Sequence, residues 1–146
     1  MSLRQSAIVC LLCACTVACS DDDDPPAGAS GDHQACVDRI NAFRATIGLP
    51  AYARDASSEA CADAQAQSDA QTDDPHGAFG DCDEFAQNEC PGWDSIEDVL
   101  DGCLQDMWDE GPGGGHYENM AGDYEEAFCG FYTTPDGEVW AIQNFR

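Results

Sequence analysis

Cysteine content constrains the fold of this 146-residue chain more than any other feature. Four of its ten cysteines fall within the first 19 residues, and six follow them: Cys36, Cys61, Cys82, Cys90, Cys103 and Cys129. An even number of cysteines in a short exported domain predicts a disulfide framework, here three bridges with fifteen possible connectivities. No two of the six are spaced as CxxC, which disfavours a zinc–thiolate site.

The N-terminal segment predicts export. Arg4 gives it a positive charge, and the apolar run over residues 7–12 is too short to cross a bilayer as a helix. Small residues then lead to Cys19, which is followed at once by a serine and four aspartates. This order is typical of a lipoprotein signal, in which the new N-terminal cysteine is acylated after cleavage. We predict a signal peptide over residues 1–19 and lipidation at Cys19.

Two alternatives remain open for this segment. Cys15 has a leucine three residues before it, where Cys19 has a threonine, so Cys15 fits the first position of the lipoprotein pattern better. An ordinary cleaved signal would instead release the protein. The predicted location is therefore the bacterial outer membrane or cell surface as a lipoprotein, or otherwise secretion.

The charge of the chain excludes some partners. It holds 29 acidic and five basic residues, with a formal net charge of −24, and removal of Arg4 with the signal would make it more negative. Nucleic-acid phosphates would be repelled by such a chain. Anionic membrane surfaces are disfavoured for the same reason, so membrane contact is expected only through the lipid anchor. A soluble, acid-rich surface is the simplest use of this charge.

The sequence after the signal divides into a tether and one domain. Residues 20–32 form an acidic linker with too little apolar surface to fold, and residues 33–146 form a domain of ordinary size. Apolar residues recur at helical spacing in the first two thirds of this domain. They predict three helices, over residues 34–47, 56–70 and 95–107.

The last third of the chain changes to a strand-like pattern. Residues 128–132 and 139–145 flank a Pro-Asp-Gly turn and predict a hairpin, and residues 116–121 predict a third strand. Residues 72–94 are expected to form a long loop. Helices on both faces of a short sheet predict an α+β fold, a three-layer α/β/α sandwich with a small antiparallel sheet.

Proximity in the chain and on the expected helices suggests three disulfide pairs. Two cysteines would close a small loop within residues 72–94, two would join the first and second helices, and two would join the third helix to the hairpin. The predicted pairs are Cys36–Cys61, Cys82–Cys90 and Cys103–Cys129.

A series of short motifs then gives the chain a family resemblance. Each motif is weak alone, but they occur in one order: Asn41-Ala42-Phe43-Arg44, Gly48-Leu49-Pro50, Ala86-Gln87-Asn88, Met107-Trp108-Asp109-Glu110, His116-Tyr117 with Met120, and Cys129-Gly130-Phe131-Tyr132. Over residues 34–146 the chain resembles the CAP superfamily, which includes cysteine-rich secretory proteins, venom antigens and pathogenesis-related proteins. The resemblance implies that Arg44 is a buried structural residue.

The resemblance also implies a central groove lined by two histidines and two glutamates. Matched by position, these are His76, Glu110 and His116, while the remaining glutamate is replaced by Gln87. Gln87 offers hydrogen bonds but neither a charge nor a general base. Glu84 or Glu89 could supply a carboxylate in its place.

Imidazoles and carboxylates that meet in one groove suit a divalent cation such as zinc, for which His76 and His116 are the predicted ligands. No HExxH pattern orients them. We expect a binding module whose groove takes a small apolar ligand or lipid, a divalent cation or a partner. The alternative is a metal-assisted hydrolase or protease-like enzyme that uses His76, Glu110 and His116, and the missing base at Gln87 disfavours it. A purely structural acidic protein is a third hypothesis.

Overall fold

The computed structural model describes residues 30–146. The predicted signal peptide, both candidate lipidation sites at Cys15 and Cys19, and most of the linker lie outside the described residues. The elements are α1 (Ser30–Thr46), β1 (Ala53–Arg54), α2 (Glu59–Thr72), β2 (Ala86–Trp93), α3 (Ile96–Asp98), the π-helical η1 (Val99–Cys103), α4 (Leu104–Asp109), α5 (Gly115–Met120), β3 (Glu126–Thr133) and β4 (Val139–Phe145).

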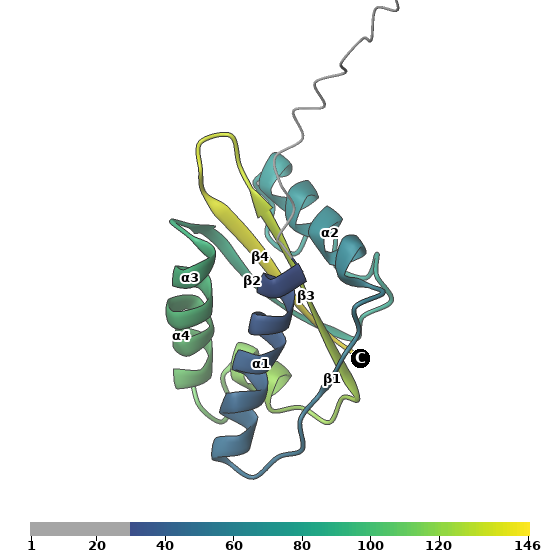
Figure 1. Ribbon diagram of the computed structural model, residues 1–146, viewed down its shortest axis with the longest axis vertical. Helices are drawn as coiled ribbons and strands as arrows, with labels where there is room; N and C mark the ends of the chain where they lie inside the picture. The colour runs from purple at the N-terminus through teal and green to yellow at the C-terminus, as the bar shows by residue number, and fades with distance from the viewer. Residues whose placement is uncertain (1–29) are drawn as a thin grey trace, which may run out of the picture.

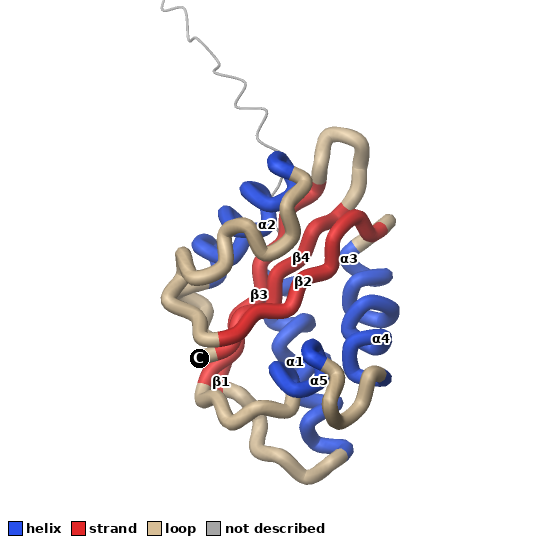
Figure 2. The backbone as a smooth tube through the Cα atoms, turned by 180° about the vertical axis from the view of Figure 1, so that it is seen from behind, coloured by secondary structure: helices blue, strands red, loops and turns tan. Residues whose placement is uncertain are grey.

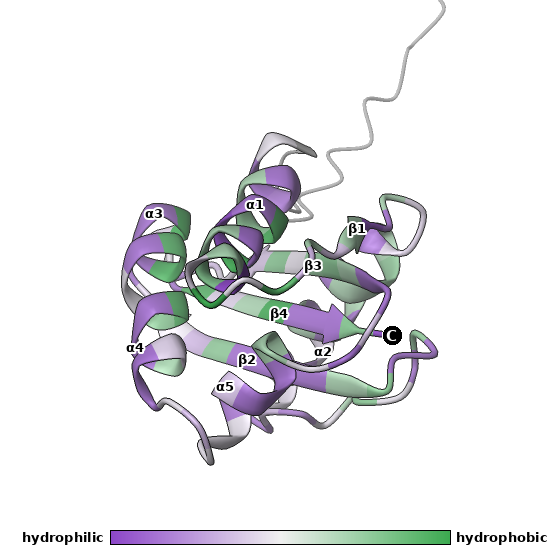
Figure 3. Ribbon diagram, turned by 90° about the horizontal axis from the view of Figure 1, so that it is seen from below, coloured by the Kyte–Doolittle hydropathy of each residue, from purple (hydrophilic) through white to green (hydrophobic). Residues whose placement is uncertain are grey.

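The strands form one four-stranded sheet in the order β1-β3-β4-β2 (Figure 1). The pairs β2–β4 and β3–β4 are antiparallel, and the two-residue β1 is parallel to β3. Helix α1 and the continuous α3–η1–α4 segment cover one face of the sheet, while α2 covers the other (Figure 3). The predicted three-layer α+β sandwich is therefore confirmed, with one short parallel pair at its edge.

Alternation along the central strands separates two cores. Phe131 of β3 faces α1 and α4 and packs with Ile40 and Leu104, whereas Phe128 faces α2. The alanine-rich α2 lies very close to the sheet, since a Cβ atom at Gly130 would overlap the backbone carbonyl of Ala62. Small side chains on the helix and a glycine on the strand together permit this approach.

Arg44 is fully buried in the larger core, as the resemblance implies. Its exposed fraction is 2 %. The guanidinium donates to the carbonyl oxygens of Pro50, Met120 and Gly122, and it lies over the ring of Tyr52. It therefore ties the end of α1 to the segment after α5 through neutral acceptors.

The structure corrects three predicted elements. Residues 116–121 do not form a strand: residues 116–120 belong to α5, Ala121 caps it, and the amide of Glu118 donates to the carbonyl of Gly114. The third strand is β2, which lies inside the segment 72–94 that we expected to be a loop. Figure 2 shows the remaining loop leading from α2 to the start of β2. The last three residues assigned to the linker, 30–32, form the first turn of α1.

All three predicted disulfide pairs are wrong. The bonds are Cys36–Cys129, Cys61–Cys82 and Cys90–Cys103. Pairing follows the two faces of the sheet: four of these cysteines belong to the larger core, while Cys61 on α2 and Cys82 belong to the smaller core on the other face. The predicted Cys36–Cys61 and Cys82–Cys90 bonds would each have had to cross the sheet. Cys103 lies on the correct face for Cys129 but is bonded to β2 instead.

Within residues 30–146, none of the helices is both long and apolar enough to cross a membrane.

Candidate functional site

The loop between α2 and β2 is held by buried carboxylates. Asp69 Oδ1 accepts a hydrogen bond from the Ala78 amide at 2.9 Å. Glu84 accepts from the amides of Gly80 and Cys82, at 2.6 and 3.0 Å. The segment is irregular, so its backbone amides have no partners from a helix or a strand. The carboxylates accept from three of these amides instead. They fix the loop that carries His76.

The backbone of His76 lies in the left-handed region, with φ at 64°. Few residues other than glycine adopt this conformation without a compensating contact. Glu89 provides one, because its Oε2 atom accepts from the His76 amide at 2.5 Å. The backbone geometry is therefore set by β2, which lies 13 residues further along the chain.

Gln87 orients the imidazole of His76. Its side-chain Nε2 donates to Asn144 Oδ1 at 3.1 Å, which leaves its Oε1 atom to accept from His76 Nδ1 at 2.8 Å. Asn144 in turn donates to Gln65 Oε1 at 2.6 Å, so the network joins β2, β4 and α2. With its proton on Nδ1, neutral His76 has its Nε2 lone pair available to another molecule.

Glu89 supplies the carboxylate that Gln87 lacks. Its exposed fraction is 4 %, its Oε2 atom lies 3.8 Å from His76 Nδ1, and its Oε1 atom has no hydrogen-bond partner among the described residues. Burial raises the pKa of Glu89 to about 7. Of the two substitutes that the sequence suggested, Glu89 therefore lies beside His76, whereas Glu84 is occupied by loop amides.

Glu110 and His116 form a second pair at the start of α5. His116 Nδ1 lies 2.6 Å from Glu110 Oε1, and the His116 amide donates to Glu110 Oε2 at 3.1 Å. The hydrogen bond with His116 lowers the pKa of Glu110. Gly114 makes room for this contact, since a Cβ there would overlap the side chain of Glu110.

Two asparagines join α5 to β2. Asn88 donates to the carbonyl oxygen of His116 at 3.1 Å, and Asn119 donates to the carbonyl oxygen of Gln87 at 3.2 Å. Asn119 also donates to Asn88 Oδ1 at 2.9 Å. These hydrogen bonds hold α5 beside β2, the strand that carries Gln87.

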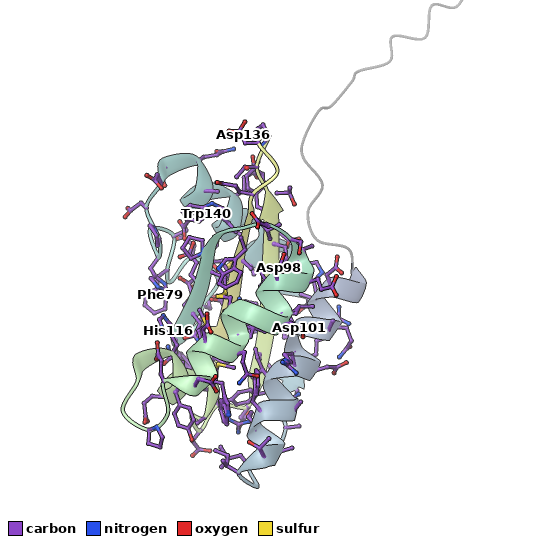
Figure 4. The ribbon with its side chains drawn as sticks, turned by 90° about the vertical axis from the view of Figure 1, so that its left-hand side faces the viewer. Phe79, Asp98, Asp101, His116, Asp136 and Trp140 are labelled. Carbon is purple, nitrogen blue, oxygen red and sulfur yellow. A yellow bond between two sulfur atoms is a disulfide. The ribbon has the colours of Figure 1, made fainter. Side chains whose placement is uncertain are left out.

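An open groove of about 360 Å³ lies where the loop, β2 and α5 meet, and it is lined by His76, Phe79, Phe85, Ala86, Gln87 and Asn119. Two of the four predicted site residues, His76 and Gln87, therefore line it. The other two, Glu110 and His116, form their own pair at the start of α5 instead. Figure 4 shows Phe79 and His116 on the same flank of the molecule.

The residues do not fit the predicted metal site. Across residues 30–146, no three side chains of His, Cys, Asp or Glu gather closely enough to hold a metal ion. The set of His76, Glu110 and His116 is thus not assembled as the ligands of a catalytic zinc, which requires three protein ligands. The metal-centred predictions gain no support from this arrangement.

Sequence reasoning missed the apolar walls of the groove. Phe79 and Phe85 have exposed fractions of 50 % and 75 %, unusually high for large apolar side chains. The sequence could have indicated them, because each is a single large apolar residue among glycines, alanines and carboxylates in the segment between α2 and β2. Asn119 gave no such signal.

The comparisons with known proteins agree with this architecture. The cysteine-rich secretory protein family, CAP, matches residues 37–145. An outer surface protein from Borrelia burgdorferi has a similar fold, with a TM-score of 0.59 at 15 % identity over 84 % of this chain and 98 % of that one. A comparison with curated proteins gives no match. Because the family match covers well over half of the sequence, the chain belongs to the CAP family of cysteine-rich secretory proteins.

Proposed function

We propose that the protein is an exported binding module, lipid-anchored at Cys19, whose groove takes a small neutral lipid that bears a hydroxyl group. The observation that carries this proposal is that Phe79 and Phe85 line the same groove as the His76 imidazole, whose Nε2 atom has no hydrogen-bond partner within residues 30–146. Ligand sites are mostly apolar with a few placed polar groups. Apolar rings left exposed on a soluble domain indicate a surface that something covers.

Phe85 connects the groove to a second hollow, of about 320 Å³. Its other lining residues are Tyr124 and four charged residues, Asp123, Glu125, Glu126 and Arg146. A hydrocarbon chain seated on Phe79 could therefore continue across Phe85 as far as Tyr124, while the charged residues of the hollow would limit its length. Burial of apolar surface supplies the affinity for such a chain.

The charge around His76 determines which polar head group the groove can accept. His76 Nε2 can accept a hydrogen bond from a hydroxyl group, whereas a fatty-acid carboxylate would have no hydrogen to offer once ionised. The carboxylate of Glu89, close to the ring, and the net charge of −24 would repel an anion. These features favour an alcohol over an acid.

Calorimetric titration with 1-decanol and with decanoate tests the proposal, because the two share a chain length and differ in the head group. We expect 1-decanol to bind and decanoate to bind more weakly. The variants Phe79→Ser and Phe85→Ser should each weaken 1-decanol about tenfold, which corresponds to the loss of a modest apolar contact. Ile47→Ser is the matched control, since Ile47 is also exposed, at 49 %, but does not line the groove. Equal effects of all three variants, or tighter binding of decanoate, would overturn the proposal.

The anchor has its own test. The name of the Borrelia protein places that protein at the outer surface, which agrees with the N-terminal pattern of this chain. Metabolic labelling with an alkyne fatty acid should mark the full-length protein, and Cys19→Ala should abolish the label while Cys15→Ala preserves it. The reverse result would assign the anchor to Cys15, and an unlabelled wild type would overturn the proposed anchor.

A further inference from the structure

Another hollow, of about 320 Å³, lies at the hairpin end of the sheet and is separate from the His76 groove. It opens between the end of α2 and the β3–β4 hairpin, where Ala70, Tyr132 and Trp140 are among its lining residues. Figure 4 shows Asp136 and Trp140 toward this end of the molecule, with Phe79 and His116 further along it.

Two aromatic side chains in this hollow have unused polar groups. Tyr132 and Trp140 are cross-strand partners, and each has an exposed fraction of only 6 %. In the part of the chain that the structure describes, neither the Tyr132 hydroxyl nor the Trp140 indole N–H makes a hydrogen bond. Neither polar atom is among the buried, unpartnered side-chain atoms of residues 30–146, so solvent reaches both of them although the rings are buried. Both groups are therefore available to a ligand in the hollow.

The rim of the hollow is negative and carries no positive side chain. Asp73, Asp136 and Glu138 line it, and none of them forms an ion pair within residues 30–146. The chain contains no lysine, and its ion-paired arginines, Arg39, Arg54 and Arg146, contact carboxylates elsewhere. The negative charge is thus not neutralised from within the described structure.

The end of α2 adds to this potential. The last turn of this 14-residue helix contributes Ala70 and Gln71 to the lining. The C-terminal end of a helix carries a partial negative charge, because its last carbonyl groups lack helical partners. Carboxylates and a helix C-terminus both attract a cation.

We propose that this hollow binds a small organic cation that also carries hydroxyl groups, the chemistry of an amino sugar or an amino alcohol. The ammonium group faces Asp136 and Glu138, and the carbon skeleton lies against the small exposed parts of Tyr132 and Trp140 that line the hollow. The indole N–H of Trp140 donates to a hydroxyl oxygen of the ligand, and the Tyr132 hydroxyl accepts from it. The site is distinct from the His76 groove and does not depend on the function proposed for that groove.

Heteronuclear NMR of the protein tests this proposal, with glucosamine as the cationic probe and glucose as its neutral counterpart. The chain has three tryptophans, so the indole N–H signal of Trp140 is identified by its loss in Trp140→Phe. We expect glucosamine at mildly acidic pH to shift this signal saturably, and added salt to weaken the effect. Glucose should leave the signal in place. Equal shifts with glucose, or shifts at Trp93 and Trp108 alone, would overturn the proposal.

A matched pair of double variants separates the site from the general acidity of the surface. Asp136→Asn/Glu138→Gln should lower the affinity for glucosamine about tenfold, because it removes two exposed charge contacts of roughly 0.7 kcal/mol each. Glu97→Gln/Asp106→Asn removes the same charge from exposed positions on α3 and α4 and should leave the affinity unchanged. All four changes lie on exposed side chains, so well-dispersed amide spectra should confirm folding of both variants. An equal loss of affinity in the two variants would mean that glucosamine is attracted only by the overall negative charge, and it would refute a specific site.

Discussion

Glu89 Oε2 lies 2.5 Å from the backbone nitrogen of His76, whereas Oε1 of the same buried carboxylate has no hydrogen-bond partner among the described residues. Asp69, which raises the pKa of Glu89 through its charge, likewise has an unpartnered oxygen, Oδ2, within residues 30–146. One loop of the groove is thus held through two carboxylates that are only half satisfied. Such groups are costly when ionised, because desolvation favours the neutral form.

The first prediction concerns Glu89→Gln. Burial raises the pKa of Glu89 from 4.5 to about 7. Between these values the folded state binds more protons than the unfolded state, so the free energy of unfolding falls as the pH rises, and the full loss is present above pH 7. Glu89→Gln should therefore stabilise the domain above neutral pH, by roughly 2 kcal/mol, and have little effect below the lower value. Denaturant unfolding at a series of pH values measures this.

Glu84→Gln is the matched control for that variant. Both oxygens of Glu84 already accept hydrogen bonds from the protein: Oε1 from the Gly80 amide and Gln65, and Oε2 from the Cys82 amide. An amide nitrogen placed at either position would face a donor, so this change should destabilise the fold by about 1–3 kcal/mol. Stabilisation by Glu84→Gln, or an unaltered pH profile for Glu89→Gln, would contradict the account of these carboxylates.

The second prediction concerns His33, which sequence reasoning placed at the boundary between linker and domain. It is 4 % exposed in α1, its Nε2 atom lies 2.8 Å from Asp63 Oδ1, and Glu59 and Arg54 are the other charges that face it. The hydrogen bond with Asp63 raises the pKa of His33 above 6.5, against the opposing effect of burial. Its charged form thus stabilises the fold fully below 6.5, and this contribution is lost as the pH rises through the higher, folded-state pKa.

Replacement of His33 should therefore change the free energy of unfolding most at acidic pH. His33→Gln is expected to lower the free energy of unfolding by about 1–2 kcal/mol at mildly acidic pH and by less in alkaline solution. The imidazole signal of His33 in NMR should titrate above the ordinary value. A variant whose stability loss grows with pH would show that the charged form contributes nothing.

The third prediction concerns the disulfides. The Cys36–Cys129 bond spans 93 residues, whereas the Cys61–Cys82 bond spans 21. Restriction of the unfolded chain grows with the span, so Cys36→Ser/Cys129→Ser should cost about 4.5 kcal/mol and Cys61→Ser/Cys82→Ser about 3 kcal/mol. Cys61 is also partly exposed, so mild reduction should open its bond first. Peptide mapping after graded reduction checks the order, and prior loss of a buried bond would refute it.

The fourth prediction tests the contact between α2 and the sheet. Gly130→Ala would place a methyl group against the Ala62 carbonyl, a rigid backbone atom, and should destabilise the domain by about 1–3 kcal/mol or prevent folding. Gly115→Ala is the control, since nothing lies within 4 Å of its Cβ position. Thermal unfolding of the two variants gives the comparison. If Gly130→Ala matched Gly115→Ala in stability, the close approach would be wrong.

Helical periodicity and the Pro-Asp-Gly turn were sufficient to predict α1, α2, the α3–η1–α4 segment, the hairpin and the layered architecture. They failed for β2, because its residues Gln87, Asn88 and Glu89 are polar and its end contains Pro91. These side chains are stabilised inside the protein by partners from α2, β4 and α5, which no local pattern reveals. The prediction of a strand over residues 116–121 failed because six residues of mixed polar and apolar character carry too little periodicity to separate a strand from a short helix.

The sequence was enough to predict which residues belong to the site, but not which of them lie together in the structure. The ordered motifs pointed to His76, Gln87, Glu110 and His116, and two of them line the groove. Which histidine pairs with which acceptor depends on the register of β2 against β4 and on the left-handed backbone at His76. The disulfide pairs were missed for a related reason, since only the final layers decide which cysteines share a face.

The Cys36–Cys129 bond has a mechanical consequence. Only a short piece of helix lies between Ser30 and Cys36, so a pull on the chain that precedes α1 can unwind no more than that piece before it meets a covalent link. The force then passes directly into β3, an interior strand of the sheet, instead of peeling α1 away from the core. A tether at the N-terminus would thus pull on an interior strand of the sheet, and most of α1 would stay packed on the core under tension.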